Sequence, residues 1–294
     1  MEGRSIKQVI KNSLPYGVVM YIHNNRNFIH ELLKSPYQAI NTLSNLKKNK
    51  IYNNIYEGKR CFILCSGPSI NKQKIELLKN EIVFGVSTGY NHPKYKIIQP
   101  QFHITPQFTY TEKFTNETAK KHLKNMEQFI APYTELFFNI TEKNIIEENS
   151  LFKNHKVNYV WFNGEFKSKK NNIFDISTFV PGVQSVPIMG IILAMYMGFK
   201  EIYLVGTEHD SFITGKYKYA FESAIGNKTD ISVDNNGGVI KTNELKSITE
   251  IFVQYSVLNN IAKSNGIQIK NATLGGALEE FERVDLDVLL KKQI

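Results

Sequence analysis

Small and polar residues follow an apolar segment early in the chain, in a pattern that can bind phosphate. Residues 61–65 are apolar, as in a short strand buried on both faces of a parallel sheet, and Ser66, Gly67, Pro68 and Ser69 come next. If a helix begins at Pro68, which fits a first helical turn, its unpaired N–H groups and its dipole both favour an anion. Gly67 lets the backbone approach such a ligand, and Ser69 can cap the helix or donate to the phosphate. The alternative is a strand-to-helix turn that binds no ligand.

Adjacent ionisable residues, Glu208, His209 and Asp210, follow another apolar segment. An imidazole has an unperturbed pKa of about 6.5, and neighbouring carboxylates are expected to raise it into the range of a general base. His209 and Asp210 are therefore catalytic candidates, although a histidine here can instead merely hydrogen-bond a loop. Glu208 and Asp210 offer a second possibility, because Mg²⁺ prefers carboxylates together with phosphate and water.

Further polar candidates occur where other apolar segments end or begin. Ser87 and Thr105 each end an apolar segment. Ser185 precedes a long apolar stretch, and a helix starting there can hold a second anion. Asn271 stands near the end of the last apolar segment, before two glycines, and can contact a base or an acceptor, or only form a turn.

Short apolar segments alternate with stretches that can be helical from residue 58 onward. The expected strands are 61–65, 81–87, 102–105, 135–140, 157–162, 201–206 and 267–273, and the expected helices include 71–80, 183–198 and 244–266. This alternation predicts an α/β fold built on a doubly wound, mostly parallel, Rossmann-like sheet. Ligands of such sheets lie beyond the carboxyl ends of the strands, where the strand order reverses, and the polar candidates fall at that edge.

The first part of the chain differs in character from the rest. Residues 1–57 are basic and helical in pattern, and we interpret them as an N-terminal helical extension of a nucleotide-binding domain at 58–294. The extension can be an amphipathic helix on an anionic membrane surface, or a helix packed on the main domain. No segment reaches the ~18–20 consecutive apolar residues that span a bilayer.

Composition points to anionic small-molecule partners. The net charge is +9, but no nucleic-acid motif is present, so binding to nucleic acid is not expected. The only two cysteines, Cys61 and Cys65, and the absence of zinc spacing favour a reduced compartment. We therefore expect a cytoplasmic protein that can also contact the inner face of the membrane peripherally.

Four motifs occur in an order that resembles two related groups of proteins: CSGPS, MGFKEIYLVG, GKYKYAF and KNATLGGALE. The turn, the apolar helix leading to a strand, and the late NATLGG are similar to the MptE-like (6-hydroxymethylpterin diphosphokinase-like) domain family. The turn, the segment 198–204 and the Tyr-Ala-Phe at 219–221 resemble bacterial lipooligosaccharide sialyltransferases. The resemblance covers about residues 58–290 and leaves the first 57 unexplained.

The resemblance implies roles for further residues and also shows departures. Tyr217 and Tyr219 stand where the sialyltransferases carry tyrosines that hydrogen-bond the leaving phosphate, although they can also only pack a loop. The asparagines that end the first strands of those enzymes are replaced here by Ser66, Ser87 and Thr105. Their general-base histidine lies after the Tyr-Ala-Phe segment, whereas this chain has no histidine beyond residue 209.

Three hypotheses follow for function. The first is a glycosyltransferase of surface-glycan assembly, such as lipopolysaccharide biosynthesis, that binds a nucleotide-sugar donor and a glycan acceptor. Its donor would be a CMP-linked nonulosonic acid, and it would require no cofactor. The second is a Mg²⁺-dependent pyrophosphokinase of the MptE type, with the metal on Glu208 and Asp210. The third is a non-catalytic module that holds a nucleotide or a glycan.

Overall fold

The structure, a computed structural model, describes residues 36–105, 107, 116–164, 166–167, 171–215, 218–221 and 242–291. Its strands are β1 (Arg60–Leu64), β2 (Val83–Val86), β3 (Phe102–Thr105), β4 (Glu135–Asn139), β5 (Val157–Phe162), β6 (Phe179–Val180), β7 (Glu201–Val205), β8 (Gln268–Asn271) and β9 (Glu282–Arg283). They form one nine-stranded sheet in the order β6-β5-β4-β3-β2-β1-β7-β8-β9, and every neighbouring pair is parallel. The predicted doubly wound α/β fold is confirmed.

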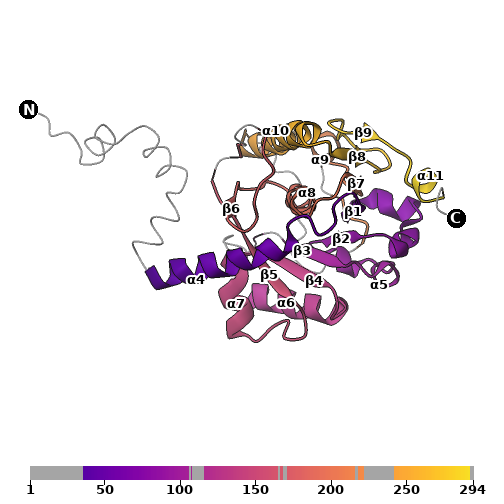
Figure 1. Ribbon diagram of the computed structural model, residues 1–294. Coiled ribbons are helices and arrows are strands. Elements are labelled where there is room, and N and C mark those ends of the chain that lie inside the picture. The colour runs from indigo at the N-terminus through magenta and orange to yellow at the C-terminus, as the bar shows by residue number, and fades with distance from the viewer. Residues whose placement is uncertain are drawn as a thin grey trace, which may run out of the picture.

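Helices cover both faces of this sheet (Figure 1). The α-helices are α4 (Pro36–Lys47), α5 (Tyr95–Ile98), α6 (Asn116–Phe129), α7 (Lys143–Glu148), α8 (Val186–Tyr196), α9 (Ser211–Thr214), α10 (Thr242–Ser264) and α11 (Leu286–Lys291). Short 3₁₀ segments are η1 (Lys48–Tyr52), η2 (Pro68–Lys72), η3 (Ile75–Asn80), η4 (Gly89–Asn91) and η5 (Ile140–Glu142). No helix in the described ranges is both long enough and apolar enough to cross a bilayer.

Helix α8 forms the centre of the larger apolar core. Its residues 187–196 are all buried, because the helix lies on β1, β2, β3 and β7 and is covered by α10. Gly190 permits the close approach to the sheet, since a β-carbon there would lie 3.0 Å from Ile63 Cδ1 and 3.1 Å from Ile104 Cδ1. A helix that is apolar all round is typical of such a position, and it explains the long apolar stretch in the sequence.

The opposite face of the sheet is covered by other elements. Alternate residues of β1 point to it, so that Phe62 and Leu64 pack with η2, η3 and α11 residues, while Ile63 packs with the α8 side. Farther along the sheet, α6 and α7 cover β4 and β5. Burial on both faces explains why the strand segments read as continuous apolar runs.

The described part of the N-terminal extension packs against the main domain. The Asn49 side chain, 1% exposed, donates to the carbonyl oxygens of Tyr159 and Ile176 at 2.7 and 2.9 Å. Leu46 and Tyr52 are also buried. Residues 1–35 lie outside the described residues, and the domain boundary at residue 57 stays a prediction.

The structure differs from the predicted elements in two places. The stretch 71–80, expected as one helix after the turn at 66–69, consists of η2 and η3, because the backbone is extended at Gln73, with φ −116° and ψ 154°, and so separates the two short helices. The strands β6 and β9 were not predicted, since each has only two residues and carries little periodic signal.

Candidate functional site

A cleft lies at the carboxyl edge of the sheet, between β1 and β7, where the strand order reverses. Strands β1 to β6 run outward in one direction from this point, and β7 to β9 run outward in the other. The cleft has a volume of about 230 Å³, and its lining includes Ser66, Ser87, Ser185, Asp210 and Tyr219. Larger hollows of about 370 and 420 Å³ border η1, away from these residues. Because nine of the predicted site residues line the smaller cleft, we take it as the candidate site.

The turn at 66–69 is already occupied by a side chain of the protein itself. The Ser69 N–H donates to Glu208 Oε1 at 2.7 Å, and the Gly67 N–H donates to the Gly206 carbonyl oxygen at 3.1 Å. Gly67 and Pro68 line the cleft, whereas Ser69 is buried beneath it. The prediction that these N–H groups are free for a phosphate is therefore wrong, because the Glu208 carboxylate satisfies the donor expected to hold the ligand. The sequence could not reveal a partner 139 residues away.

Glu208 is fixed in turn by the loop that follows β8. The Ala277 N–H donates to the Glu208 carbonyl oxygen at 2.7 Å. Gly276 has a φ of +84°, and a β-carbon there would lie 2.6 Å from the Glu208 Cα and carbonyl oxygen. The second glycine of NATLGG is thus required both by its conformation and by the close approach of the Glu208 backbone.

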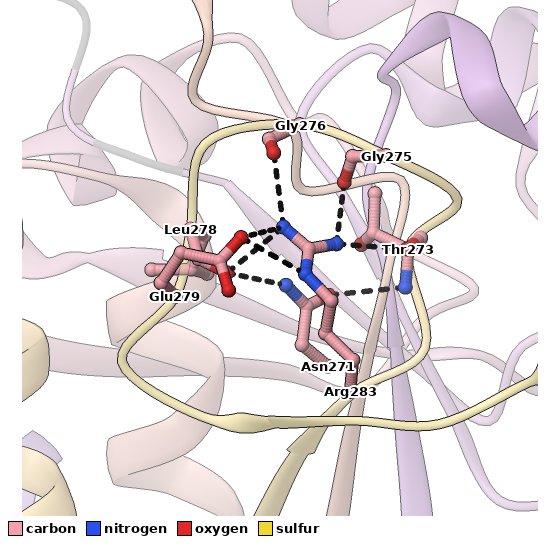
Figure 2. A network of polar contacts seen from close by, with 7 residues as sticks. All are labelled: Asn271, Thr273, Gly275, Gly276, Leu278, Glu279 and Arg283. Carbon is pink, nitrogen blue, oxygen red and sulfur yellow. Dashed lines mark hydrogen bonds and ion pairs between the residues drawn. The ribbon is translucent and has the colours of Figure 1, made fainter.

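Asn271 and Arg283 organise the same loop (Figure 2). The Asn271 side chain donates to the Leu278 carbonyl oxygen at 2.9 Å and accepts from the Thr273 N–H at 3.0 Å. It is fully buried and is not part of the cleft lining. The prediction that Asn271 binds a nucleotide is therefore corrected: its amide shapes a turn.

The Arg283 guanidinium lies at the centre of Figure 2, surrounded by backbone carbonyl groups. It donates to the carbonyl oxygens of Gly275 at 2.6 Å and Gly276 at 2.9 Å, and it pairs with Glu279 Oε1 at 2.7 Å. A guanidinium has five donors in a rigid plane, so one side chain can hold several carbonyls of a loop at once. Sequence reasoning missed this residue, because an arginine on a two-residue strand carries no motif.

His209 lies in the cleft and contacts a buried tyrosine. His209 Nε2 is 2.8 Å from the Tyr255 hydroxyl, and the histidine backbone is left-handed, with a φ of +48°. Burial lowers the pKa of His209 to about 4. The expectation that Glu208 and Asp210 raise this pKa is wrong, because desolvation of the imidazolium outweighs any attraction to the carboxylates. The imidazole is therefore neutral at pH 7.

Tyr255 connects His209 to the start of α8. Tyr255 is fully buried, which raises the pKa of its hydroxyl, and a hydrogen bond with the Ser185 side chain opposes that rise. Ser185 is the N-cap residue of α8, but its side chain makes no cap hydrogen bond. His209 and Ser185 line the cleft, and Tyr255 lies buried behind it.

The segment 218–221 lies over the turn at Ser66. The Ala220 N–H donates to the Ser66 carbonyl oxygen at 2.9 Å, and the Asn71 side chain donates to the Ala220 carbonyl oxygen at 2.7 Å. These bonds place Tyr219 and Lys218 at the rim of the cleft, where the Tyr219 side chain is 37% exposed. Tyr217, the other tyrosine predicted here, lies outside the described residues.

Ser87 reaches the cleft in a left-handed conformation, with a φ of +48°. Its carbonyl oxygen lies 2.9 Å from His103 Nε2, and His103 Nδ1 lies 2.7 Å from the Tyr95 hydroxyl. Burial lowers the pKa of His103 to about 3, so the neutral ring donates to Ser87 and accepts from Tyr95. Sequence analysis missed this support, although a histidine inside the apolar strand FHIT was a signal for a specific partner.

Thr105 does not reach the cleft. It is 1% exposed, and its hydroxyl donates to the Met126 sulfur at 3.6 Å, on the α6 side of the sheet. The prediction that Thr105 contacts a nucleotide is corrected for this reason. Its position in the strand directs the side chain into the α6 interface instead of along the edge.

The alternative metal site on Glu208 and Asp210 gains no support from the geometry. Glu208 holds the turn through Oε1, and Asp210 lines the cleft at the start of α9. Among the residues that the structure describes, no group of three or more histidine, cysteine, aspartate and glutamate side chains could hold a metal ion.

Comparisons with known proteins give only weak structural similarity. No protein-family model matches the chain, and no curated protein sequence matches it. A solved structure of the MAf glycosyltransferase from Magnetospirillum magneticum AMB-1 aligns with a TM-score of 0.46 and 16% identity. The alignment covers 85% of this chain and 40% of that one, so the chain spans less than half of the length of that protein.

Proposed function

We propose that the protein is a glycosyltransferase that uses a nucleotide-activated sugar. The observation that carries the proposal is the convergence of four separate segments on one cleft at the switch point of the sheet: the turn after β1, the end of β7, the start of α8, and the segment 218–221. Three of them belong to motifs that resemble the sialyltransferases. Such a position is the usual ligand site of a doubly wound fold.

The start of α8 is the best place for a donor phosphate. With 11 residues, α8 is long enough for its dipole and first N–H groups to favour an anion. Lys218 lies at the rim of the same cleft and adds a positive charge. Tyr219 stands beside it and, in this proposal, hydrogen-bonds the departing phosphate; Ser185 contributes its hydroxyl from the N-cap.

His209 acts as the general base in this scheme. The oxygen of the acceptor hydroxyl forms a bond to the anomeric carbon of the donor, and the bond from that carbon to the phosphate oxygen breaks. The nucleotide leaves with the electron pair, and His209 takes the acceptor proton. The neutral imidazole is the form that can accept it. A bound anionic donor would stabilise the imidazolium and so raise the pKa of His209, which burial lowers to about 4.

Finer assignments extend the same proposal. A CMP-linked nonulosonic acid is the donor that the sialyltransferase resemblance favours, and a surface glycan is the acceptor. The net charge of +9 is compatible with work beside an anionic membrane at the cytoplasmic face. The scheme uses no cofactor. No observation in the cleft specifically favours the pyrophosphokinase or the non-catalytic module.

Release of free nucleotide tests the proposal. Purified protein is incubated with CMP- and UDP-sugars and a glycan extract, with and without EDTA, and CMP or UDP is quantified. We expect release that survives EDTA, falls at least ~100-fold in His209→Gln, and is unchanged in His155→Gln, whose histidine contacts the Ile130 carbonyl oxygen far from the cleft. Formation of AMP from ATP that requires Mg²⁺ would replace the proposal with a pyrophosphokinase. Binding without any turnover would leave a binding module.

A further inference from the structure

We propose that the turn at 66–69 and the residues Thr207 and Glu208 form a subsite for hydroxyl groups, not for phosphate. The inference rests on the proposed function, because the hydroxyls are those of a nucleotide-sugar donor. It assigns the phosphate to the other side of the cleft, near Ser185 and Lys218.

The first step is the position of the Glu208 carboxylate. Oε1 accepts the Ser69 N–H, the donor that a phosphate at this turn would need. Oε2 lies over the α-carbon of Gly67, in the volume that a side chain at residue 67 would fill. Among the described residues, none donates a hydrogen bond to Oε2. Glu208 therefore holds the turn with one oxygen and presents the other beside the cleft.

The negative charge of Glu208 and Asp210 disfavours a phosphate at the turn. Glu208 is only 8% exposed, so a phosphate at the turn would meet its carboxylate at short range in a poorly solvated place, and Asp210 adds a second carboxylate to the lining of the same cleft. Like charges in such surroundings repel strongly, and an acceptor oxygen needs a donor opposite it. A group that carries a hydrogen to donate, such as a hydroxyl, satisfies Oε2 without repulsion.

The third step concerns the neighbouring hydroxyl of Thr207. This residue lines the cleft, yet it is only 3% exposed and its Oγ1 forms no hydrogen bond with any described residue. The hydroxyl lies close enough to the Cys65 thiol to oppose the rise of the thiol pKa that burial causes, but a thiol is at most a weak hydrogen-bond partner. Buried polar atoms in native proteins are normally paired, so the lone hydroxyl indicates a ligand atom.

Together the two side chains match a vicinal diol. The carboxylate accepts from one hydroxyl, and the Thr207 hydroxyl exchanges a hydrogen bond with the other. Carboxylates at strand ends bind ribose hydroxyls in nucleotide-binding folds for the same reason. The ribose of the nucleotide and the glycerol side chain of a nonulosonic acid both carry such hydroxyls, and a binding experiment can distinguish them.

Calorimetric titration with paired probes tests the subsite. The ribose probes are CMP and UMP, each compared with its 2′,3′-dideoxy form. The sugar probe is the methyl glycoside of N-acetylneuraminic acid, and inorganic phosphate measures anion binding. A hydrogen bond to a charged group contributes roughly 1.5–3 kcal/mol, so we expect the wild type to lose about 10- to 100-fold in affinity when the bound diol is removed. In Glu208→Gln the difference should fall below about 3-fold, while inorganic phosphate binds more tightly than to the wild type.

The outcomes distinguish ribose from sugar as the source of the bound hydroxyls, and they test the subsite separately from the proposed function. Discrimination between CMP or UMP and the dideoxy form that depends on Glu208 assigns the ribose; dependence seen only with the glycoside assigns the sugar. Equal affinities of Glu208→Gln and wild type for every probe, or no binding of any hydroxyl probe, would overturn the inference. Nucleotide release with dideoxy donors at full rate would overturn it while leaving the proposed function intact. Binding that depends on Glu208 but is not accompanied by turnover would support the subsite and contradict the proposed glycosyltransferase activity.

The matched control is Glu148→Gln, the same carboxylate-to-amide exchange at an exposed position on α7. Thermal unfolding checks that both variants fold.

Discussion

Glu208 lies against the α-carbon of Gly67, in the space where any other residue would carry a β-carbon. The Gly67 backbone itself is ordinary, with φ −68° and ψ 154°, so alanine could adopt it without strain. The glycine is therefore required by the Glu208 carboxylate and not by the turn conformation.

The first prediction is a double-mutant cycle on this contact. Gly67→Ala should lower the free energy of unfolding by about 1–3 kcal/mol, because the new methyl group overlaps the carboxylate. In a Glu208→Ala background the same change should cost less than about 0.5 kcal/mol, since the obstacle is gone. Chemical denaturation measures each term. Gly89→Ala, where a β-carbon meets nothing within 4 Å, is the control. If the free-energy changes of Gly67→Ala and Glu208→Ala simply add in the double variant, the predicted overlap between the two residues is contradicted.

The second prediction compares adjacent glycines of NATLGG. Both have a positive φ, +77° at Gly275 and +84° at Gly276, but only Gly276 meets the Glu208 backbone at 2.6 Å. Gly275→Ala should cost about 1–2 kcal/mol of stability from conformation alone. Gly276→Ala should cost at least ~2 kcal/mol more and should weaken nucleotide binding, because Glu208 must move. Equal costs for the two variants in urea titrations would mean that the Glu208 contact is unimportant.

The third prediction concerns the guanidinium of Arg283. Arg283→Lys keeps the charge but loses the planar set of donors, and we expect a loss of about 1–3 kcal/mol in unfolding free energy. Hydrogen exchange of the Ala277 N–H, which donates to Glu208, should become faster. Glu279→Gln removes only the exposed ion pair, which water and salt screen, and should leave the stability nearly unchanged. If the lysine variant exchanges like wild type, the loop is held by other contacts.

The fourth prediction is a loss of stability in acid. Burial lowers the pKa values of His103 to about 3, and of His122 and His209 to about 4, below the value of about 6.5 in an unfolded chain. Between pH 6.5 and 4 the unfolded chain binds more protons at these rings than the folded protein, so stability is fully present above pH 6.5 and falls as the pH falls. Each ring should contribute a loss of about 2 kcal/mol between pH 8 and pH 5.

Unfolding curves between pH 8 and pH 5 measure this loss. His122→Gln should make the dependence on pH shallower by about 2 kcal/mol over that range, because glutamine does not titrate. His155→Gln, at a histidine whose ring contacts the Ile130 carbonyl oxygen, serves as the comparison variant. A slope that is unchanged in His122→Gln would show that its imidazole is not buried in the neutral form.

The fifth prediction separates positioning from binding in the cleft. Tyr255→Phe removes the hydroxyl that holds His209 Nε2, so the imidazole loses its orientation. If His209 is the base, kcat should fall about 10- to 100-fold while KM changes little. Tyr203→Phe removes a hydroxyl that donates to Glu201 and should leave kcat unchanged. A rise in KM alone would mean that Tyr255 contributes to substrate binding instead.

The sequence by itself determined the fold class and the edge at which the site lies. Apolar runs such as 61–65 and 102–105 must be buried on both faces, and their alternation with helices permits little other than a parallel sheet. Polar residues that end those runs, such as Ser66 and Ser87, then fall at one edge of the sheet, and Ser185, which begins a helix, lies at the same edge. Local pattern was sufficient, because strand direction follows from connectivity alone.

Only the tertiary structure decided what the turn at 66–69 can bind. The sequence pattern indicated the small residues of the turn and their N–H groups. It did not indicate that Glu208, from the end of β7, accepts a hydrogen bond in the turn or that Tyr255 contacts His209. Thr105 and Asn271 were assigned wrongly for a related reason, since position at a strand end does not say which way a side chain points. The pKa of His209 also depended on packing, because the cost of desolvation comes from residues distant in the sequence.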